Sequence, residues 1–140
     1  MVGMVVIDIK ELPGVKVPPP NARELKVALD PTIGNYDKAT MLVSTIELES
    51  STGLHTHTSD EIMYVAKGEG ESIEVRNGVQ KAVSISEGCI IYAPRGIEHQ
   101  IRNLGNSKLI LFCVYIPGLK ASGYVEEAIG KSKNFFAKEK

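Results

Sequence analysis

Short runs of β-branched and aromatic residues, separated by turn residues, fill the middle of the chain. Asn77-Gly78 lies between two of these runs and predicts a two-residue hairpin, because both central positions of such a turn need a positive φ. Seven short strands with no helix between them are typical of an all-β sandwich or barrel. The predicted strands are residues 41–48, 61–65, 71–76, 81–85, 89–92, 99–103 and 108–116.

The two ends of the chain follow other patterns. Residues 4–9 are β-branched and predict a strand, and residues 12–20 contain a triple proline that is extended and cannot pair as a central strand. Residues 21–29 read as a short helical turn or irregular chain. After Pro117, apolar residues such as Val125 and Ile129 recur at helical spacing. We therefore expect an N-terminal strand and extended arm (1–39) on a barrel core (40–117), and a C-terminal helical tail (118–140).

Composition narrows the range of partners. The chain has 140 residues, a formal net charge of -1 and two cysteines, Cys89 and Cys113. This length suits one domain, and the balanced charge gives no electrostatic reason to expect nucleic acid or a membrane surface as partner. The N-terminus lacks the basic region of a signal peptide, so we expect a cytoplasmic protein with free thiols.

All three histidines lie in two short segments bounded by turns. His55 and His57 are two residues apart, so on an extended strand both side chains point to the same face. Glu61 follows four residues later, and His99 comes from a different predicted strand. Three imidazoles and one carboxylate suit one divalent transition metal ion, which could be Fe, Mn, Co, Ni, Cu or Zn.

Two motifs around these histidines resemble the cupin superfamily. The segment from His55 to Glu61, followed by Gly68, is similar to the first cupin motif, and residues 88–99 running on to Asn103 match the second. The first motif normally begins with a glycine where this chain has Glu49. The resemblance implies a double-stranded β-helix (jelly-roll) barrel of the small, single-domain type. It also implies that His55, His57, Glu61 and His99 are the metal ligands.

The predicted strands also indicate which residues surround the site. Met63 and Val65 have the same side-chain parity as Glu61 and are expected to line the pocket. On the last predicted strand, Leu111, Cys113 and Tyr115 share one face, which is expected to point into the same pocket. Cys113 reads as a small buried apolar residue, with a thiolate ligand as the alternative. Asn103 is expected to tie down a turn through its side chain. Arg95 and Arg102 could bind a substrate carboxylate, although a solvated surface role is favoured.

The function inferred from these features is a metal-dependent enzyme acting on a small organic molecule. Similar small cupins include dioxygenases, lyases, isomerases and decarboxylases, and no residue beyond the ligands selects one reaction. The alternative is a non-catalytic, metal-containing module that binds or senses a small ligand. We also expect a homodimer, in which residues 4–9 add a strand to a neighbouring sheet. The sequence specifies neither the substrate nor the metal.

Overall fold

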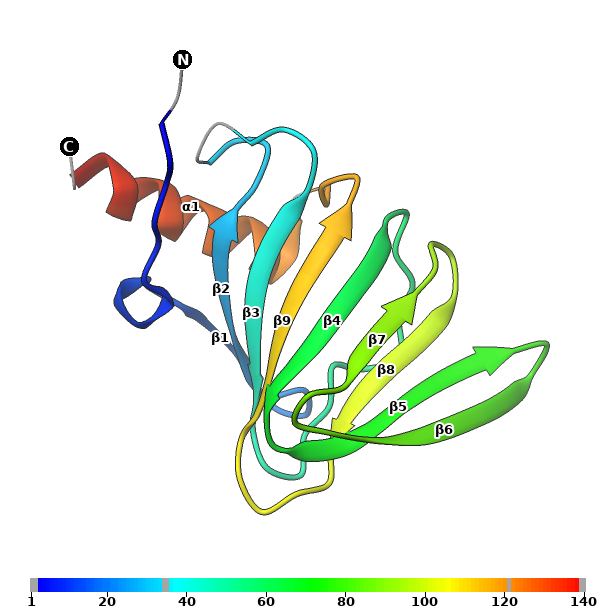
Figure 1. Ribbon diagram of the computed structural model, residues 1–140. Helices are drawn as coiled ribbons and strands as arrows, with labels where there is room; N and C mark the ends of the chain where they lie inside the picture. Colours follow the sequence, from blue (N-terminus) through cyan, green and yellow to red (C-terminus); the bar gives the residue numbers. More distant parts are fainter. Residues whose placement is uncertain (1–2, 34–35, 121, 139–140) are drawn as a thin grey trace.

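The computed structural model describes residues 3–33, 36–120 and 122–138. Its strands form two sheets that face each other, with a C-terminal helix at one side (Figure 1). The larger sheet has the order β1-β2-β3-β9-β4-β7, and the smaller has the order β6-β5-β8. The strands are β1 (Val15–Val17), β2 (Arg23–Leu29), β3 (Thr40–Ile46), β4 (Asp60–Lys67), β5 (Glu69–Arg76), β6 (Val79–Ser86), β7 (Ile90–Ala93), β8 (Glu98–Asn103) and β9 (Leu109–Ile116). This arrangement confirms the predicted jelly-roll fold class.

The predicted strands of the core all form, as β3 to β9, with ends that differ by a few residues. The β5–β6 hairpin turns at Asn77-Gly78 as predicted, with φ values of 52° and 74°. In β9, alternate side chains are buried between the sheets, as expected for a strand with one face on the core. The inward row of β9 consists of Leu109, Leu111, Cys113 and Tyr115.

The N-terminal region differs from the sequence-based expectation in two places. Residues 4–8 form no strand, and Asp8 begins a 3₁₀ turn (Ile9–Glu11) by accepting a hydrogen bond from the backbone N–H of Lys10. Met4 and Val6 are exposed, so nothing in the described chain pairs with this run. The prediction of a strand within this chain was therefore wrong, and pairing of residues 4–9 with a second copy stays a prediction.

Residues 21–29 were predicted as a helical turn or irregular chain, and that prediction was also wrong. They contain β2, which pairs antiparallel with β3. Leu25 and Val27 are buried, and alternate with the less buried Glu24 and Lys26. Although Leu, Lys, Glu and Ala favour helices, pairing with β3 outweighs this weak local preference. The proline-rich arm contributes β1 at the edge of the sheet, consistent with its predicted exclusion from a central position.

The C-terminal helix α1 (Gly123–Lys138) packs against β2 and β1, on the face of β2 that carries the core residues Leu25 and Val27. Ala128 and Ile129 are buried, and the hydroxyl of Ser132 donates a hydrogen bond of 2.6 Å to the carbonyl of Val27. The predicted helix is confirmed. Its first turn also brings Val125 to the cavity described below.

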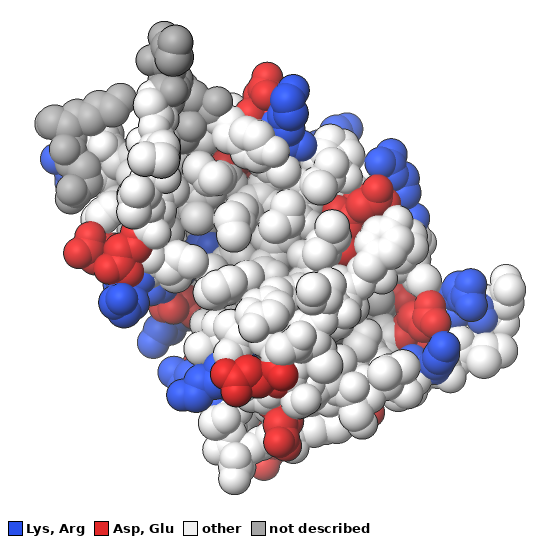
Figure 2. All heavy atoms as spheres, in the orientation of Figure 1, with Lys and Arg blue, Asp and Glu red and all other residues white. Residues whose placement is uncertain are grey.

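The surface carries charges of both signs. Figure 2 shows acidic and basic side chains interspersed around the margin of one face, whose middle is largely uncharged. On the outer side of β4 and β7, Ile62 faces Tyr92 and Tyr64 faces Ile90, and all four side chains are exposed. Within the described residues, no helix combines the length and apolar character needed to cross a membrane.

The backbone at Glu49 has the left-handed conformation that a glycine favours. Its φ is 58°, in the turn after β3 where the first cupin motif normally has glycine. A side chain in this conformation costs roughly 1–2 kcal/mol. The turn therefore has a backbone conformation that suits glycine, although the residue is Glu49. The segment that follows places His55 and His57 at the site.

Asn103 holds two loops together from the end of β8. Its side-chain amide donates to the carbonyl oxygens of Ile46, Glu47 and Ser107 at 3.1, 3.2 and 2.9 Å. Its side-chain oxygen accepts a hydrogen bond of 2.9 Å from the backbone N–H of Gly105. Asn103 is 3% exposed, so these bonds satisfy buried backbone groups. The predicted role of this side chain in fixing a turn is confirmed.

We predict that Asn103→Ala lowers the free energy of unfolding by about 2–4 kcal/mol, because it leaves buried carbonyl groups without a donor. Urea unfolding followed by circular dichroism measures the change. The matched control is Asn106→Ala on the same turn, where the side chain is exposed. Equal effects of the two substitutions would show that the Asn103 hydrogen bonds contribute little.

Candidate metal centre

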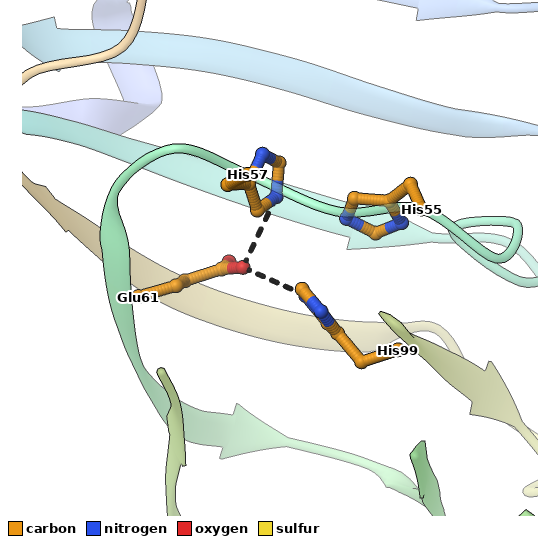
Figure 3. Close-up of side chains that lie close together, drawn as sticks. All are labelled: His55, His57, Glu61 and His99. Carbon is orange, nitrogen blue, oxygen red and sulfur yellow. Dashed lines mark hydrogen bonds and ion pairs between the residues drawn. The ribbon is translucent and has the colours of Figure 1, made fainter. Parts of the chain in front are cut away.

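Four side chains from different parts of the fold converge between the two sheets (Figure 3). His55 and His57 come from the segment that joins β3 to β4. Glu61 is the second residue of β4 in the larger sheet, and His99 is the second residue of β8 in the smaller one. The structure thus brings together all four residues that the sequence predicted as ligands, with their ligand atoms within 4.8 Å of one another.

Backbone hydrogen bonds fix the histidine-bearing segment against β8. The N–H of His55 donates to the carbonyl of His99 at 3.0 Å, and the N–H of His99 donates back to the carbonyl of His55 at 2.9 Å. The N–H of Gly96 donates to the carbonyl of His57 at 2.8 Å. These contacts hold the irregular segment alongside β8, so the positions of the histidines depend on main-chain hydrogen bonds.

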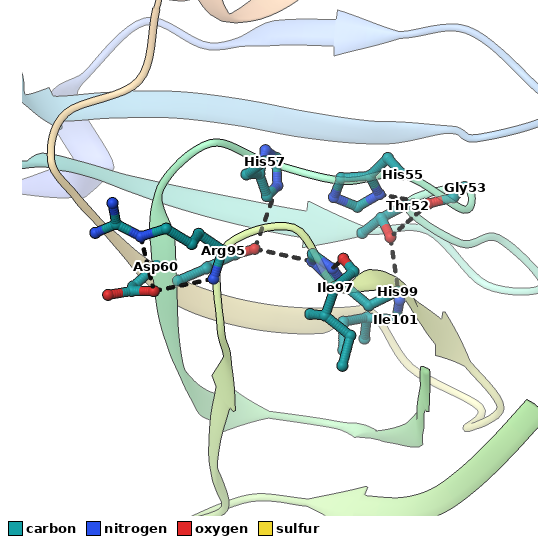
Figure 4. Close-up of polar contacts among 10 residues, drawn as sticks. Thr52, Gly53, His55, His57, Asp60, Arg95, Ile97, His99 and Ile101 are labelled. Atoms are coloured by element: carbon teal, nitrogen blue, oxygen red, sulfur yellow. Dashed lines mark hydrogen bonds and ion pairs between the residues drawn. The ribbon is translucent and has the colours of Figure 1, made fainter. Parts of the chain in front are cut away.

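Two of the imidazole rings are oriented by backbone carbonyls (Figure 4). The Nδ1 atom of His55 lies 2.6 Å from the carbonyl oxygen of Gly53, and Nδ1 of His99 lies 3.0 Å from that of Ile97. Because a carbonyl can only accept, each Nδ1 must carry the proton and donate. The opposite nitrogen, Nε2, then faces the cluster, where it could bind a metal, which is the usual arrangement for a histidine ligand.

The remaining contacts place Glu61 at the centre of the cluster. Its Oε1 atom lies 3.1 Å from Nε2 of His99 and 3.4 Å from Nε2 of His57. Nε2 of His57 is buried and has no hydrogen-bond partner among the described residues. Ligand atoms around one transition metal lie roughly 3–4 Å apart, since each bond is about 2.0–2.2 Å. The spacing and the unpartnered His57 nitrogen both fit a metal ion.

Burial and hydrogen bonding set the charges of these groups. Burial by itself would raise the pKa of Glu61, but its close contacts with His57, His99 and Tyr115 outweigh burial and lower the pKa to about 2. Burial lowers the pKa of His55 to about 4. At neutral pH Glu61 is therefore anionic and His55 is neutral, the protonation states that metal binding requires.

The cluster forms part of the wall of a cavity of about 320 Å³. Of the five predicted pocket residues, Met63, Leu111, Cys113 and Tyr115 line it. Val65 does not line the cavity, although its partner Leu111 on β9 does, because Val65 is fully buried within the packed core.

Burial keeps the thiol of Cys113 protonated. It raises the pKa of that group, and the charge of Glu61 acts in the same direction. These effects favour the small buried apolar residue over the thiolate ligand. Cys113 also stands outside the group of four ligand atoms.

The cavity includes residues that the sequence did not indicate. Arg23 and Leu25 on β2, Ser44 on β3 and Leu119 before α1 all line it. The alternation of Arg23, Leu25 and Val27 was an available signal, but the helical interpretation of this segment concealed it. Of the two arginines named from the sequence, Arg102 faces outward and lies near Glu71 at 3.4 Å.

Arg95, the other arginine named from the sequence, is also at the surface, and its Nε atom lies 3.6 Å from Oδ1 of Asp60. The backbone N–H of Arg95 donates to the same carboxylate at 2.9 Å (Figure 4). Both arginines named from the sequence therefore have the surface role that was favoured for them.

We predict that chelator-treated protein loses stability between about pH 6.5 and pH 4, partly through His55. A histidine in the unfolded chain has a pKa of about 6.5, whereas folded His55 has a pKa of about 4. The unfolded state therefore binds the proton first as the pH falls. The contribution of His55 is fully present above about pH 6.5 and is lost as the pH falls to about 4.

Urea unfolding at several pH values tests this, with His55→Gln as the comparison. The variant should show a smaller loss of unfolding free energy across the same interval. His99 does not add to that loss: burial opposes the shift, but the hydrogen bond to Glu61 raises its pKa. An identical pH dependence in the two proteins would contradict the prediction.

Comparison with known proteins agrees with this geometry. A predicted oxalate decarboxylase from Thermotoga maritima is 26% identical, with a TM-score of 0.71 over 81% of this chain and 99% of that chain. A double-stranded β-helix protein from Klebsiella pneumoniae is 20% identical, with a TM-score of 0.65 over 83% of this chain and 92% of that one.

A variant of Bacillus subtilis oxalate decarboxylase shares the fold at 16% identity, with a TM-score of 0.70 over 86% of this chain. This chain covers 32% of that enzyme. A search of curated proteins finds no match. The family model described as "Cupin domain" matches residues 42–115, more than half of the 140 residues. The chain therefore belongs to the cupin domain family.

Proposed function

We propose that this protein is a metal-dependent enzyme acting on a small organic molecule. The observation that carries the proposal is the convergence of His55, His57, Glu61 and His99 on one cavity of about 320 Å³. A cavity of that size is at the lower end of the range for small-molecule sites. A metal held in its wall would be within reach of a bound molecule.

The residues of the chain would hold the metal and limit the access of water. Three imidazole nitrogens and one carboxylate occupy four positions of a divalent transition metal, and a six-coordinate ion would keep two for exchangeable ligands. When bound, such a metal supplies Lewis acidity toward a substrate oxygen or, if redox-active, electron transfer. Apolar side chains such as Leu42, Met63 and Leu111 form much of the wall and would exclude water from the bound molecule.

Within this class we favour lyase chemistry of the decarboxylase type over dioxygenase or isomerase chemistry. The support is the Thermotoga maritima protein, which is described as a predicted oxalate decarboxylase and is covered over 99% of its length. The non-catalytic binding module is the competing proposal. It differs by binding a small molecule without converting it.

We predict about one transition metal ion per chain in protein expressed without a histidine tag, measured by elemental analysis. His99→Ala should remove most of it, because it deletes one of four ligands. The control is Glu98→Gln, an exposed neighbour on the same strand that should keep the metal. A chain that takes up none of the six candidate ions would contradict the proposed metal site.

We predict that the metal-loaded protein releases CO₂ from a small carboxylic acid, with oxalate as the first compound to test. Glu61→Gln should reduce the rate by about 100-fold or more, because it removes the anionic ligand that lies nearest two of the histidines. Labelled CO₂ and product analysis provide the measurement.

Oxygen consumption in the same assay would instead indicate dioxygenase chemistry. Ligand binding without turnover by the metal-loaded protein would favour the non-catalytic module over the enzyme.

A further inference from the structure

We propose that Arg23 and Ser44 form a carboxylate-binding subsite in the cavity of the candidate metal centre. The inference rests on the proposed function and deepens it, because it assigns the ligand to the small carboxylic acids. A carboxylate at this subsite would be held by the chain itself, while another part of the molecule faces the metal ligands.

The sheet register places the two residues on the same wall. Leu25 of β2 pairs with Ser44 of β3, and Ser44 in turn pairs with Leu111 of β9. Arg23 is two residues before Leu25 and so shares its face. All four residues line the cavity that also includes the histidine cluster. The subsite therefore belongs to the larger sheet, in the cavity whose wall also contains the potential metal ligands.

The guanidinium group of Arg23 lacks an acidic partner. Its Nη1 atom donates to the backbone carbonyl of Asn21 at 3.0 Å, and no ion pair within the described residues includes Arg23. Burial lowers the pKa of Arg23, so its side chain has lost part of its hydration. A guanidinium has five N–H donors, and a partly desolvated one is stabilised by an anion.

Ser44 provides a second, independent observation. Ser44 is 4% exposed, and its hydroxyl has no hydrogen-bond partner in the part of the chain that the structure describes. Within the described residues, two buried side-chain polar atoms lack a partner, Oγ of Ser44 and Nε2 of His57, and both residues line this cavity. Buried polar groups are normally satisfied, so the cavity is built to receive polar atoms at both places. The His57 nitrogen suits a metal, and the Ser44 hydroxyl can donate to a ligand oxygen.

The charge of the cavity favours an anion. Apart from the histidines, the charged residues along its wall are Arg23 and Glu61. With a divalent ion bound, the charges of Glu61 and Arg23 cancel, and the positive charge of the metal remains. The hydroxyl-bearing residues Thr52, Thr56 and Tyr115 also line the cavity but are neutral, so Arg23 and the metal are the positive groups that would attract a carboxylate. Bidentate pairing with the guanidinium would fix its orientation.

The test measures binding of malonate and of malonamide, its uncharged diamide, to the metal-loaded protein by calorimetry. Wild-type protein should bind malonate at least about tenfold more tightly than malonamide. Arg23→Gln should lose most of this preference, while Arg23→Lys should keep part of it, because lysine retains the charge without the planar fork. Ser44→Ala should weaken malonate binding by a smaller factor, about 3- to 10-fold.

The control is Arg102→Gln, which removes an exposed arginine outside the cavity and should leave both affinities unchanged. Metal content and thermal unfolding of every variant show whether an effect arises from lost metal or lost fold. Malonate binding that is unchanged in a folded, metal-loaded Arg23→Gln protein would overturn the subsite. So would equal affinity of the wild type for malonate and malonamide.

The subsite and the proposed function can fail separately. Discrimination against malonamide that depends on Arg23, with no turnover of any acid, would support the subsite and refute the enzyme. Turnover that is insensitive to Arg23 would support the enzyme and refute the subsite.

Discussion

The position of the candidate site depends on how the segment between β3 and β4 is held against β8. That segment has no regular strand of its own, yet it carries two of the four potential ligands. The reciprocal backbone bonds between His55 and His99 fix it at one point, and the bond from the N–H of Thr52 to the carbonyl of Ile101 fixes it at another. Asn103 connects the same strand to the end of β3. The two sheets are thereby held in the relative position in which Glu61 faces the histidines.

This support allows an unfavourable group of side chains to exist in the core. A buried carboxylate and three closely spaced imidazoles would be costly without directed partners, because burial disfavours charge. Glu61 is 3% exposed, and the lowering of its pKa depends on contacts made from both sheets. The unpartnered nitrogen of His57 is the part of this arrangement that protein groups alone leave unsatisfied. The cluster therefore has the character of a preorganised binding site.

The central part of the fold and the ligand cluster could be predicted from sequence because their signals are local. Glycine-containing turns and alternating strands mark β3 to β9, and the spacing of His55, His57 and Glu61 is visible in seven residues. The N-terminal region gave wrong predictions because its structure depends on distant partners. β2 forms by pairing with β3, and residues 4–8 have β-branched side chains but no neighbour in the described chain.

The same limitation applied to the cavity. Parity along one strand indicated that Met63 faces the cavity, but parity does not show which inward side chains are covered by their neighbours, and Val65 is packed within the core. Arg23 could not be assigned to the cavity until β2 was placed beside β3. Cavity residues on β2, a strand that was not predicted, are therefore among those that local patterns miss.

The wall of the cavity is assembled from residues inside and outside the segment that matches the family model. The potential metal ligands all fall within residues 42–115, the part that matches the family, whereas Arg23, Leu25, Leu119 and Val125 lie outside it. Strands and helices that flank a shared core can change without disturbing the ligands inside it. Two members of this family could thus have the same metal chemistry and yet select different molecules. For such chains, similarity of the core supports the same metal ligands. It does not support the same substrate, because residues outside the core also line the cavity.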